Sequence, residues 1–480
     1  MNRAIPKIKF SVADWICILI CSIPAFYLLG HPAIYIWDEA VYVNASWDMA
    51  HGAAWLVPVN PTYNTKPPLV LWLQALSLKV IPSAEWAVRL PSALAVSGIL
   101  LMLQFALKRW GFDIWTRCLV LICFVSNEGF IRHHIGRTGD LDAVMSFFMT
   151  AYAITLLDAI VQRRWTNRHM VVFFIAVVGA FYAKSIGGWL LLGPLLFVWL
   201  LSPLRIVLIR PRFWIAGATA LMACIAYYLV REMMQPGYLD LVIHSEYMRM
   251  FSNVMPWHEH GPGYYFSNFK LLGTYYPWSI VLALCTITGL FLIKDPKVKE
   301  HLLRWIILGA GFMLMITIPA VKLEWYDAPA YSWFALIIGG AMGHFVSRAP
   351  ESMRWLLLIP ATLMLWRKMD FLQKDQSPRH PFEYEGAMLR EVKETLPNKV
   401  YMEVEHPEHR LQLDFYRKWI AEQMGKNVEV VDTISNVVEG DQLLISQKAA
   451  LETIQSQFAL DTIRVWAGLG YEVKVKAKKQ

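Results

Sequence analysis

Residues 12–39 read VADWICILICSIPAFYLLGHPAIYIWDE, an apolar segment that ends in two adjacent carboxylates, Asp38 and Glu39. An apolar stretch of about 20 residues is long enough to cross a bilayer as a helix. Carboxylates beside a membrane are costly to place and usually serve a function. Because a loop rich in Trp and Tyr follows, this stretch indicates a membrane helix that leads into a chemical site at the bilayer surface.

The composition supports a membrane protein. Of the 480 residues, 56% are hydrophobic and 17% are charged, whereas soluble proteins carry about 25% charged residues. The 21 Trp residues suit aromatic belts at the membrane interfaces. The net charge of +8 comes mostly from short loops between apolar runs, so it does not indicate a nucleic-acid partner. All six Cys lie in apolar segments, which predicts buried thiols without disulfides.

Apolar segments predict a polytopic α-helical protein with about eleven membrane helices, and thirteen as the upper bound. The predicted spans are 12–30, 88–107, 116–132, 141–161, 169–184, 188–203, 213–230, 273–293, 304–321, 329–347 and 353–368. The shorter segment 68–82 is predicted to lie at the interface. Lys and Arg concentrate in every second loop, which predicts a cytoplasmic N-terminus in a cell inner membrane. The first segment could also be read as a signal peptide, but it has no small-residue cleavage site.

The chain divides into two predicted domains. Residues 1–368 form the membrane domain, with large extracytoplasmic loops at 31–87 and 231–272. Residues 369–480 are expected to form a small α/β domain on the same outer side. Its predicted strands are 400–404, 428–431, 442–446 and 471–475, and its predicted helices are 409–424 and 449–458.

Charged residues of the membrane region gather at the predicted outer ends of the helices. The set comprises Asp38, Glu39, Lys66, Arg137, Asp140, Asp142, Lys184 and Lys322. Cations at an interface can hold a phosphate through charge-assisted hydrogen bonds, and a carboxylate can accept a proton from an incoming hydroxyl. The pattern therefore predicts transfer of a group from a lipid-linked phosphate to an acceptor.

Each of these residues also has a structural interpretation. The acids could cap helix N-termini, and the lysines could be helix ends that extend toward the interface. His258 and His260 could bind a metal or contact solvent or substrate. A transporter or flippase, or a structural envelope protein, is the alternative class. The absence of an internal repeat and the gathering of charge at one face favour an enzyme over a transporter.

Several motifs, in their order and spacing, resemble the membrane glycosyltransferases of type C fold. The quoted pieces are Trp37-Asp38-Glu39-x-x-Tyr42, Tyr63-x-x-Lys66-Pro67-Pro68, Arg137-Thr-Gly-Asp-Leu-Asp142, Lys184, and Lys322-Leu-Glu-Trp-Tyr326. They are similar to the protein O-mannosyltransferase-like group and to bacterial aminoarabinose transferases that modify lipid A. The resemblance covers roughly residues 30–340.

The resemblance implies transfer of a sugar from a polyprenyl-phosphate donor to an extracytoplasmic glycolipid such as lipid A, a glycan or a protein. It gives Asp38 the role of base or acceptor-positioning group and makes Asp142 a second functional aspartate, so Asp38 and Asp142 are the predicted catalytic residues. Lys66 and Tyr326 correspond to positions near the lipid phosphate. Some aminoarabinose transferases have a metal-binding Glu before the loop lysine, where this chain has Thr65. No cofactor is therefore predicted from the sequence. The alternative is a divalent metal bound by His258 and His260.

The remaining predicted site residues are expected to bind substrate. They are Glu39, Tyr63, Arg137, Asp140, Lys184, His258 and Lys322, beside Lys66 and Tyr326. A single displacement at the anomeric carbon requires one base and no covalent enzyme intermediate, so the predicted transfer proceeds with inversion.

Overall fold

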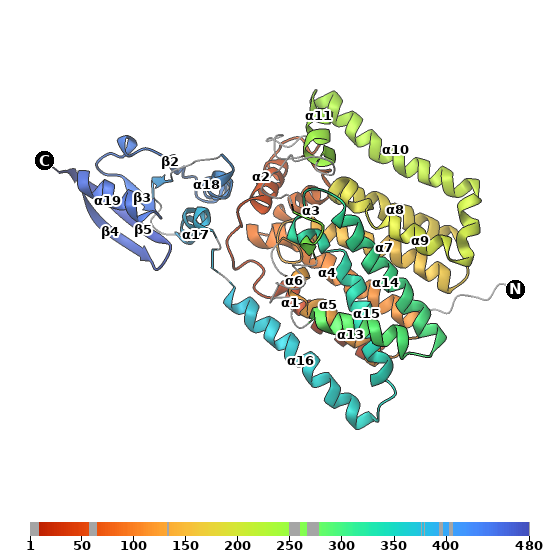
Figure 1. Cartoon of the computed structure of the whole chain (residues 1–480). Helices are drawn as coiled ribbons and strands as arrows, with labels where there is room; N and C mark the ends of the chain where they lie inside the picture. Colours follow the sequence, from red (N-terminus) through yellow and green to blue (C-terminus); the bar gives the residue numbers. More distant parts are fainter. Residues whose placement is uncertain are drawn as a thin grey trace.

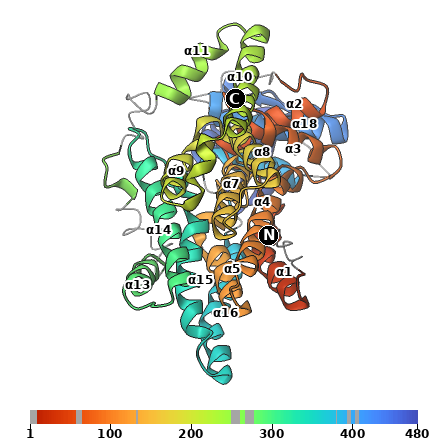
Figure 2. The ribbon, with the colours of Figure 1, turned by 90° about the vertical axis from the view of Figure 1, so that its right-hand side faces the viewer.

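A helical bundle and a smaller sheet-containing unit make up the molecule (Figure 1). The computed structural model describes residues 9–56, 65–131, 134–248, 260–265, 278–375, 377–378, 380–392, 397–402 and 407–479. Figure 2 shows that α10 and α11 lie on one side of the bundle and that α16 lies on the opposite side.

Each of the eleven predicted membrane segments contains a helix. The α-helices up to residue 374 are α1 (Val12–Phe26), α2 (Asp38–Ala50), α3 (Leu69–Leu78), α4 (Ala84–Arg109), α5 (Ile114–Ser126), α6 (Glu128–Ile131), α7 (Asp142–Val161), α8 (Asn167–Lys184), α9 (Leu192–Leu200), α10 (Pro211–Met234), α11 (Tyr238–Val242), α13 (Trp278–Phe291), α14 (Pro296–Thr317), α15 (Ala330–Val346) and α16 (Glu351–Lys374). Shorter helical turns between them are η2 (Ser185–Trp189), η3 (Pro203–Ile209), η4 (Ile243–Tyr247) and η7 (Glu324–Asp327).

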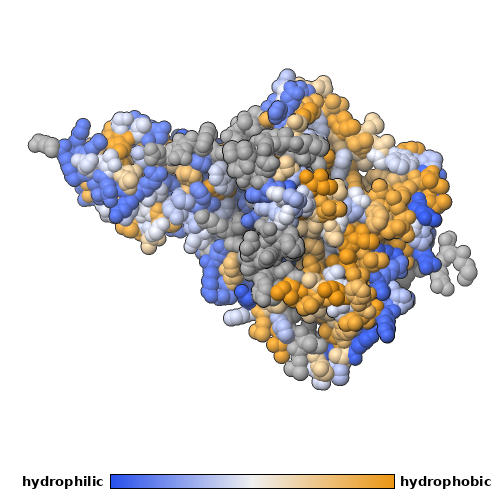
Figure 3. All heavy atoms as spheres, viewed as in Figure 1, coloured by the Kyte–Doolittle hydropathy of each residue, from blue (hydrophilic) through white to orange (hydrophobic). Residues whose placement is uncertain are grey.

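Some of these helices have the length and apolar composition of a membrane span. Among the described residues, five helices are long and apolar enough to cross a membrane: α4, α7, α8 with η2, α10 and α14. The pair α9 and η3, bent by 113°, makes a sixth if it is one broken span. Hydrophobic residues gather on the visible face of the bundle, whereas the sheet-containing unit is mostly hydrophilic there (Figure 3). The multi-span helical class is confirmed, and the count of eleven spans stays a prediction.

The C-terminal unit contains a five-stranded mixed sheet of order β2-β1-β3-β5-β4. Its strands are β1 (Lys399–Tyr401), β2 (Glu429–Val431), β3 (Gln442–Ile445), β4 (Phe458–Trp466) and β5 (Gly470–Lys478). β1 pairs in parallel with β2 and β3, and β5 is antiparallel to β3 and β4. Its helices are α17 (Tyr384–Glu391), α18 (Leu411–Met424) and α19 (Lys448–Gln457), with turns η8 (Pro381–Glu383), η9 (Pro407–Arg410) and η10 (Ile434–Asn436).

The predicted α/β character of this unit is confirmed, but the prediction missed α17 and β4. The prediction placed 458 at the end of a helix, whereas it begins β4. Two register shifts interrupt the pairing of β4 with β5, and most of its residues are exposed. The alternation of apolar and polar residues that identifies a half-buried strand is therefore absent.

The C-terminal unit holds the chain that leads into Asp38. The hydroxyl of Tyr416 accepts a hydrogen bond from the Ile34 amide at 2.9 Å. The carboxylate of Glu383 accepts one from the Ile36 amide at 3.0 Å. Gln412 donates to the Ile34 carbonyl at 2.6 Å. Because these contacts satisfy buried backbone groups, they fix the path of the loop just before α2.

A buried ion pair anchors the same loop to the bundle. Arg89 on α4 meets Glu39 on α2 through two bonds, Nε–Oε1 at 2.7 Å and Nη2–Oε2 at 2.8 Å. Arg89 also donates to the carbonyls of Leu29, Pro32 and Ala33. The side chains of Arg89 and Glu39 are 0% and 1% exposed. All of these groups lie out of water, so each depends on the others for its hydrogen bonds.

We expect Arg89→Met to destabilise the protein by about 3–5 kcal/mol, because it leaves the Glu39 carboxylate buried and uncompensated. The change should appear as a lower melting temperature of the detergent-solubilised full chain. The matched control is Asp370→Asn, which breaks the exposed pair between Lys374 and Asp370 and should have little effect. Equal melting temperatures for Arg89→Met and wild type would contradict a central role for the buried pair.

Candidate active site

Four of the predicted site residues line one pocket at an end of the bundle. Asp142 begins α7, Lys184 ends α8, Lys66 precedes α3, and Tyr326 lies in η7. The pocket encloses about 730 Å³, counting space that is open to solvent. Its other lining residues are Glu246 and a mostly apolar set, Met145, Ile186, Gly187, Leu190, Phe312, Ile316, Pro319 and Val321. A charged end and an apolar wall suit a ligand with an anionic head and a hydrocarbon tail.

Both lysines of the pocket are paired with carboxylates. Lys184 Nζ lies 2.6 Å from each carboxylate oxygen of Asp142 and 5.3 Å from the centre of the Tyr326 ring. Lys66 forms an ion pair with Glu246, whose second oxygen accepts a hydrogen bond from the Thr65 hydroxyl at 2.6 Å. A lysine that extends to the membrane interface would have an exposed ammonium group. Lys66 and Lys184 are instead paired with carboxylates inside the pocket.

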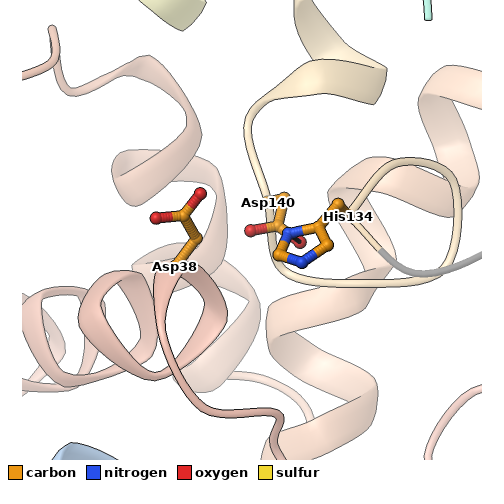
Figure 4. Close-up of side chains that lie close together, drawn as sticks. All are labelled: Asp38, His134 and Asp140. Atoms are coloured by element: carbon orange, nitrogen blue, oxygen red, sulfur yellow. Dashed lines mark ion pairs between the residues drawn. The ribbon is translucent and has the colours of Figure 1, made fainter. Parts of the chain in front are cut away.

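A second cluster forms where α2 faces the loop before α7. In Figure 4 the carboxylates of Asp38 and Asp140 and the imidazole of His134 lie close together. One ligand atom of each lies within 4.8 Å of the others. Two carboxylates and an imidazole are suitable ligands for a divalent transition metal. Among the described residues, this is the group that could hold a metal ion, and the predicted His260 is not part of it.

The electrostatics of this cluster fit a need for positive charge. Burial raises the pKa of Asp140 well above its usual range, and the negative charges of Asp38 and Glu39 raise it further. Burial lowers the pKa of His134, whose ring stacks on Trp325 with centroids 4.0 Å apart. A cation bound by Asp38, Asp140 and His134 would therefore stabilise the ionised form of both carboxylates.

The loop between Gly136 and Asp142 is held by its neighbours. The Gly139 amide donates to Glu39 at 2.7 Å. A Cβ on Gly139 would lie 3.0 Å from the Gln74 amide nitrogen and 3.3 Å from the Glu39 Cγ. Arg137 donates to the carbonyls of Pro24 and Tyr27 at 2.7 and 2.6 Å. This loop is therefore packed against α1, α2 and α3 in a way that places Asp140 and Asp142.

Three residues predicted to bind substrate make contacts with buried groups of the chain. Glu39 pairs with Arg89, and Arg137 donates to backbone carbonyls. Lys322, which is 3% exposed, donates to the carbonyls of His260 and Pro319. Their charges stabilise loops around the site, and the sequence pattern could not distinguish this role from ligand binding. Tyr63 and His258 lie outside the described residues.

Asp38 and Glu39 lie in the first turn of α2, where a helix N-terminus favours acidic side chains, but this is not their whole environment. Trp37, the residue before α2, makes no side-chain cap hydrogen bond and has a positive φ of 65°. Glu39 accepts from the Tyr35 amide and from Arg89. Asp38 is half-buried and faces the cluster with His134 and Asp140.

Sequence reasoning missed Glu246, His134 and Asp327. Asp327 directly follows Tyr326 and is buried, and its Oδ2 accepts from the Tyr331 hydroxyl at 2.8 Å. Burial raises the pKa of Asp327 to about 8, and the Tyr331 hydrogen bond opposes that rise. Asp327 directly follows the motif Lys322-Leu-Glu-Trp-Tyr326, and this position could have identified it as a candidate site residue. Glu246 and His134 belong to no motif that spacing could identify.

The raised pKa of Asp327 predicts a pH-dependent stability. The folded protein keeps this proton up to a pH of about 8, whereas the unfolded chain releases it near pH 4. The contribution of protonated Asp327 to folding stability is therefore fully present below about pH 4, and it is lost as the pH rises toward and through 8. We expect Asp327→Asn to remove this part of the decline in melting temperature between pH 5 and 8.

The control for Asp327→Asn is Asp461→Asn, an acid exposed on β4 that pairs with Lys476. It should keep the wild-type dependence of melting temperature on pH. An Asp327→Asn variant with the same slope as wild type would contradict a buried proton on Asp327.

Comparison with known proteins agrees with this architecture. Residues 65–229 match the family described as dolichyl-phosphate-mannose-protein mannosyltransferase. The chain is 24% identical over 328 residues to the undecaprenyl phosphate-alpha-4-amino-4-deoxy-L-arabinose arabinosyl transferase of Pseudomonas savastanoi pv. phaseolicola. That match covers 65% of this chain and 58% of the Pseudomonas protein, so the chain spans less than two thirds of that relative.

A second relative and a solved structure extend the comparison. An uncharacterized protein of Aquifex aeolicus is 22% identical over 358 residues, which cover 71% of this chain and 66% of that protein. The crystal structure of ArnT from Cupriavidus metallidurans bound to undecaprenyl phosphate superposes with a TM-score of 0.66 at 14% identity. It covers 97% of this chain and 98% of ArnT. Residues 65–229 thus resemble that mannosyltransferase family, and the chain as a whole has the fold of ArnT.

Proposed function

We propose that this protein transfers a sugar from a polyprenyl-phosphate donor to an extracytoplasmic acceptor, with inversion. The observation that carries the proposal is the pocket that Lys66 and Lys184 line together with a mostly apolar set of side chains. The likeness to ArnT bound to undecaprenyl phosphate supports the same class of donor. The acceptor is a glycolipid, a glycan or a protein.

The proposed chemistry is a single displacement. An acceptor hydroxyl oxygen forms a bond to the anomeric carbon as the bond from that carbon to the phosphate oxygen breaks. The electron pair of the broken bond stays on the phosphate, which Lys66 and Lys184 stabilise electrostatically. Asp38 accepts the hydroxyl proton and later releases it to water. If the acceptor is an ionised phosphate, it needs no base, and Asp38 then orients the donor sugar or the acceptor.

The other charged residues of the site have distinct proposed roles. Asp142 holds the Lys184 ammonium in place through its two close contacts. Glu39 and Arg137 are positioning residues that set the loops carrying Asp38 and Asp140. A divalent metal, if held by Asp38, His134 and Asp140, would supply positive charge beside these two acids.

The distribution of charge supports the proposed topology. At the end of α4 opposite the Arg89 contact, Lys108 pairs with Asp14, and Arg117 contacts the same carboxylate. Basic residues in such loops favour the cytoplasmic side. Residues 1–368 then form the membrane domain of an inner-membrane enzyme. Residues 369–480 form an extracytoplasmic domain that supports the loop before Asp38.

We expect Asp38→Asn to lower transfer to a hydroxyl acceptor by about 10²- to 10⁴-fold, the usual contribution of a general base. Mass spectrometry of envelope lipids, glycans and glycoproteins can compare a deletion strain complemented with each variant. The mass increment that the deletion removes would identify the sugar and its carrier. It should return with wild type and remain absent with Asp38→Asn.

The matched control is Asp48→Asn. Asp48 lies on the same helix as Asp38 but pairs with Lys418 of α18, so its substitution should restore the mass increment. Full restoration by Asp38→Asn as well would contradict a catalytic role for Asp38.

A further inference from the structure

We propose that Glu246 is an internal competitor for the lipid phosphate, which must displace its carboxylate from Lys66 in order to bind. The inference rests on the proposed function, because it concerns the same pocket and the same anionic ligand. It assigns to Glu246 control over how tightly the enzyme holds its donor and its polyprenyl-phosphate product.

The geometry places a carboxylate where a phosphate would be bound. One oxygen of Glu246 pairs with the Lys66 ammonium, and the other accepts the Thr65 hydroxyl hydrogen bond at 2.6 Å. The side chains of Lys66 and Glu246 are 13% and 10% exposed, and both line the pocket. A phosphate oxygen makes the same kinds of bond with an ammonium and a hydroxyl, so the two anions compete for these donors.

The backbone around Lys66 is held more firmly than that around Glu246. The Tyr238 hydroxyl donates to the Thr65 carbonyl at 2.9 Å, and the Tyr227 hydroxyl donates to the Lys66 carbonyl at 3.3 Å. Glu246 lies instead in the π-helix η4, in which no residue is buried. Single π-helical turns are rare and often mark functional sites. Two tyrosine hydroxyls thus hold the backbone at Thr65 and Lys66, whereas Glu246 lies on a turn that contains no fully buried residue.

Charge balance explains what the competition achieves. The pocket holds two lysines and two carboxylates, so the charges of Lys66, Lys184, Asp142 and Glu246 cancel. Asp142 is buried and contacts Lys184 through both oxygens, which makes Glu246 the carboxylate that can yield to a phosphate. The transfer converts a phosphodiester into a phosphomonoester with a greater negative charge. With Asp142 still on Lys184, an uncompensated Lys66 would retain that product, and return of Glu246 to Lys66 favours its release.

The test measures binding of undecaprenyl phosphate to the full chain in detergent. We expect Glu246→Gln, which keeps the size of the side chain and removes its charge, to bind this lipid about tenfold more tightly than wild type. Glu246→Ala should bind more tightly as well. The control Glu324→Gln removes an exposed acid of η7 and should bind like wild type, which separates local competition from a general change in charge.

A double substitution locates the effect at Lys66. If Glu246 acts by occupying this ammonium, Glu246→Gln should no longer tighten binding when Lys66→Gln is also present. In assays of transfer, Glu246→Gln should show an initial burst followed by slower turnover, because product release becomes limiting. A merely structural role of Glu246 would produce no such burst.

Two different failures can be distinguished. If wild type binds undecaprenyl phosphate but Glu246→Gln binds it equally or less tightly, the competition is overturned and the proposed function stands. If neither wild type nor Glu246→Gln binds the lipid although their melting temperatures are equal, the proposed donor is wrong, and this inference fails with it.

Discussion

The buried bond between Arg89 and Glu39 is the contact on which the site depends. Two charges without solvent are stable only when each has a partner and enough hydrogen bonds. Arg89 meets this requirement with Glu39 and three carbonyls of the chain before α2. Glu39 adds the Gly139 amide of the loop before α7. One ion pair therefore joins α2, α4 and that loop, and so places Asp38 beside Asp140.

The C-terminal unit completes this arrangement from outside the bundle. Glu383, Gln412 and Tyr416 bind the backbone between residues 34 and 36, directly before Asp38. A loop beside a reactive group gains precision when elements on both of its sides hold it. In the pocket, the ammonium groups of Lys66 and Lys184 pair with the carboxylates of Glu246 and Asp142. Buried cations without those acids would carry a large desolvation cost.

The sequence predicted much of the site, because charges inside apolar segments are rare and easily recognised. Asp142, Lys184 and Lys66 were identified from their charge and Tyr326 from the resemblance to a family motif, and the structure brings all four to one pocket. Glu39, Arg137 and Lys322 were predicted to bind substrate, and in the structure each contacts groups of the chain itself. A charge that contacts the protein looks identical in sequence to one that binds a ligand. Glu246 escaped notice because it lies in the short π-helix η4, outside the motifs that the sequence singled out.

By itself, the sequence determined the helical membrane class, the C-terminal α/β unit and the order of the charged motifs. These properties follow from local hydrophobicity and period, which a single chain displays directly. Only the tertiary structure decided which charges meet. Glu39 finds Arg89 50 residues away and Gly139 100 residues away, and Lys66 finds Glu246 at a separation of 180. Packing of distant helices creates such pairs, and no local pattern of residues encodes them.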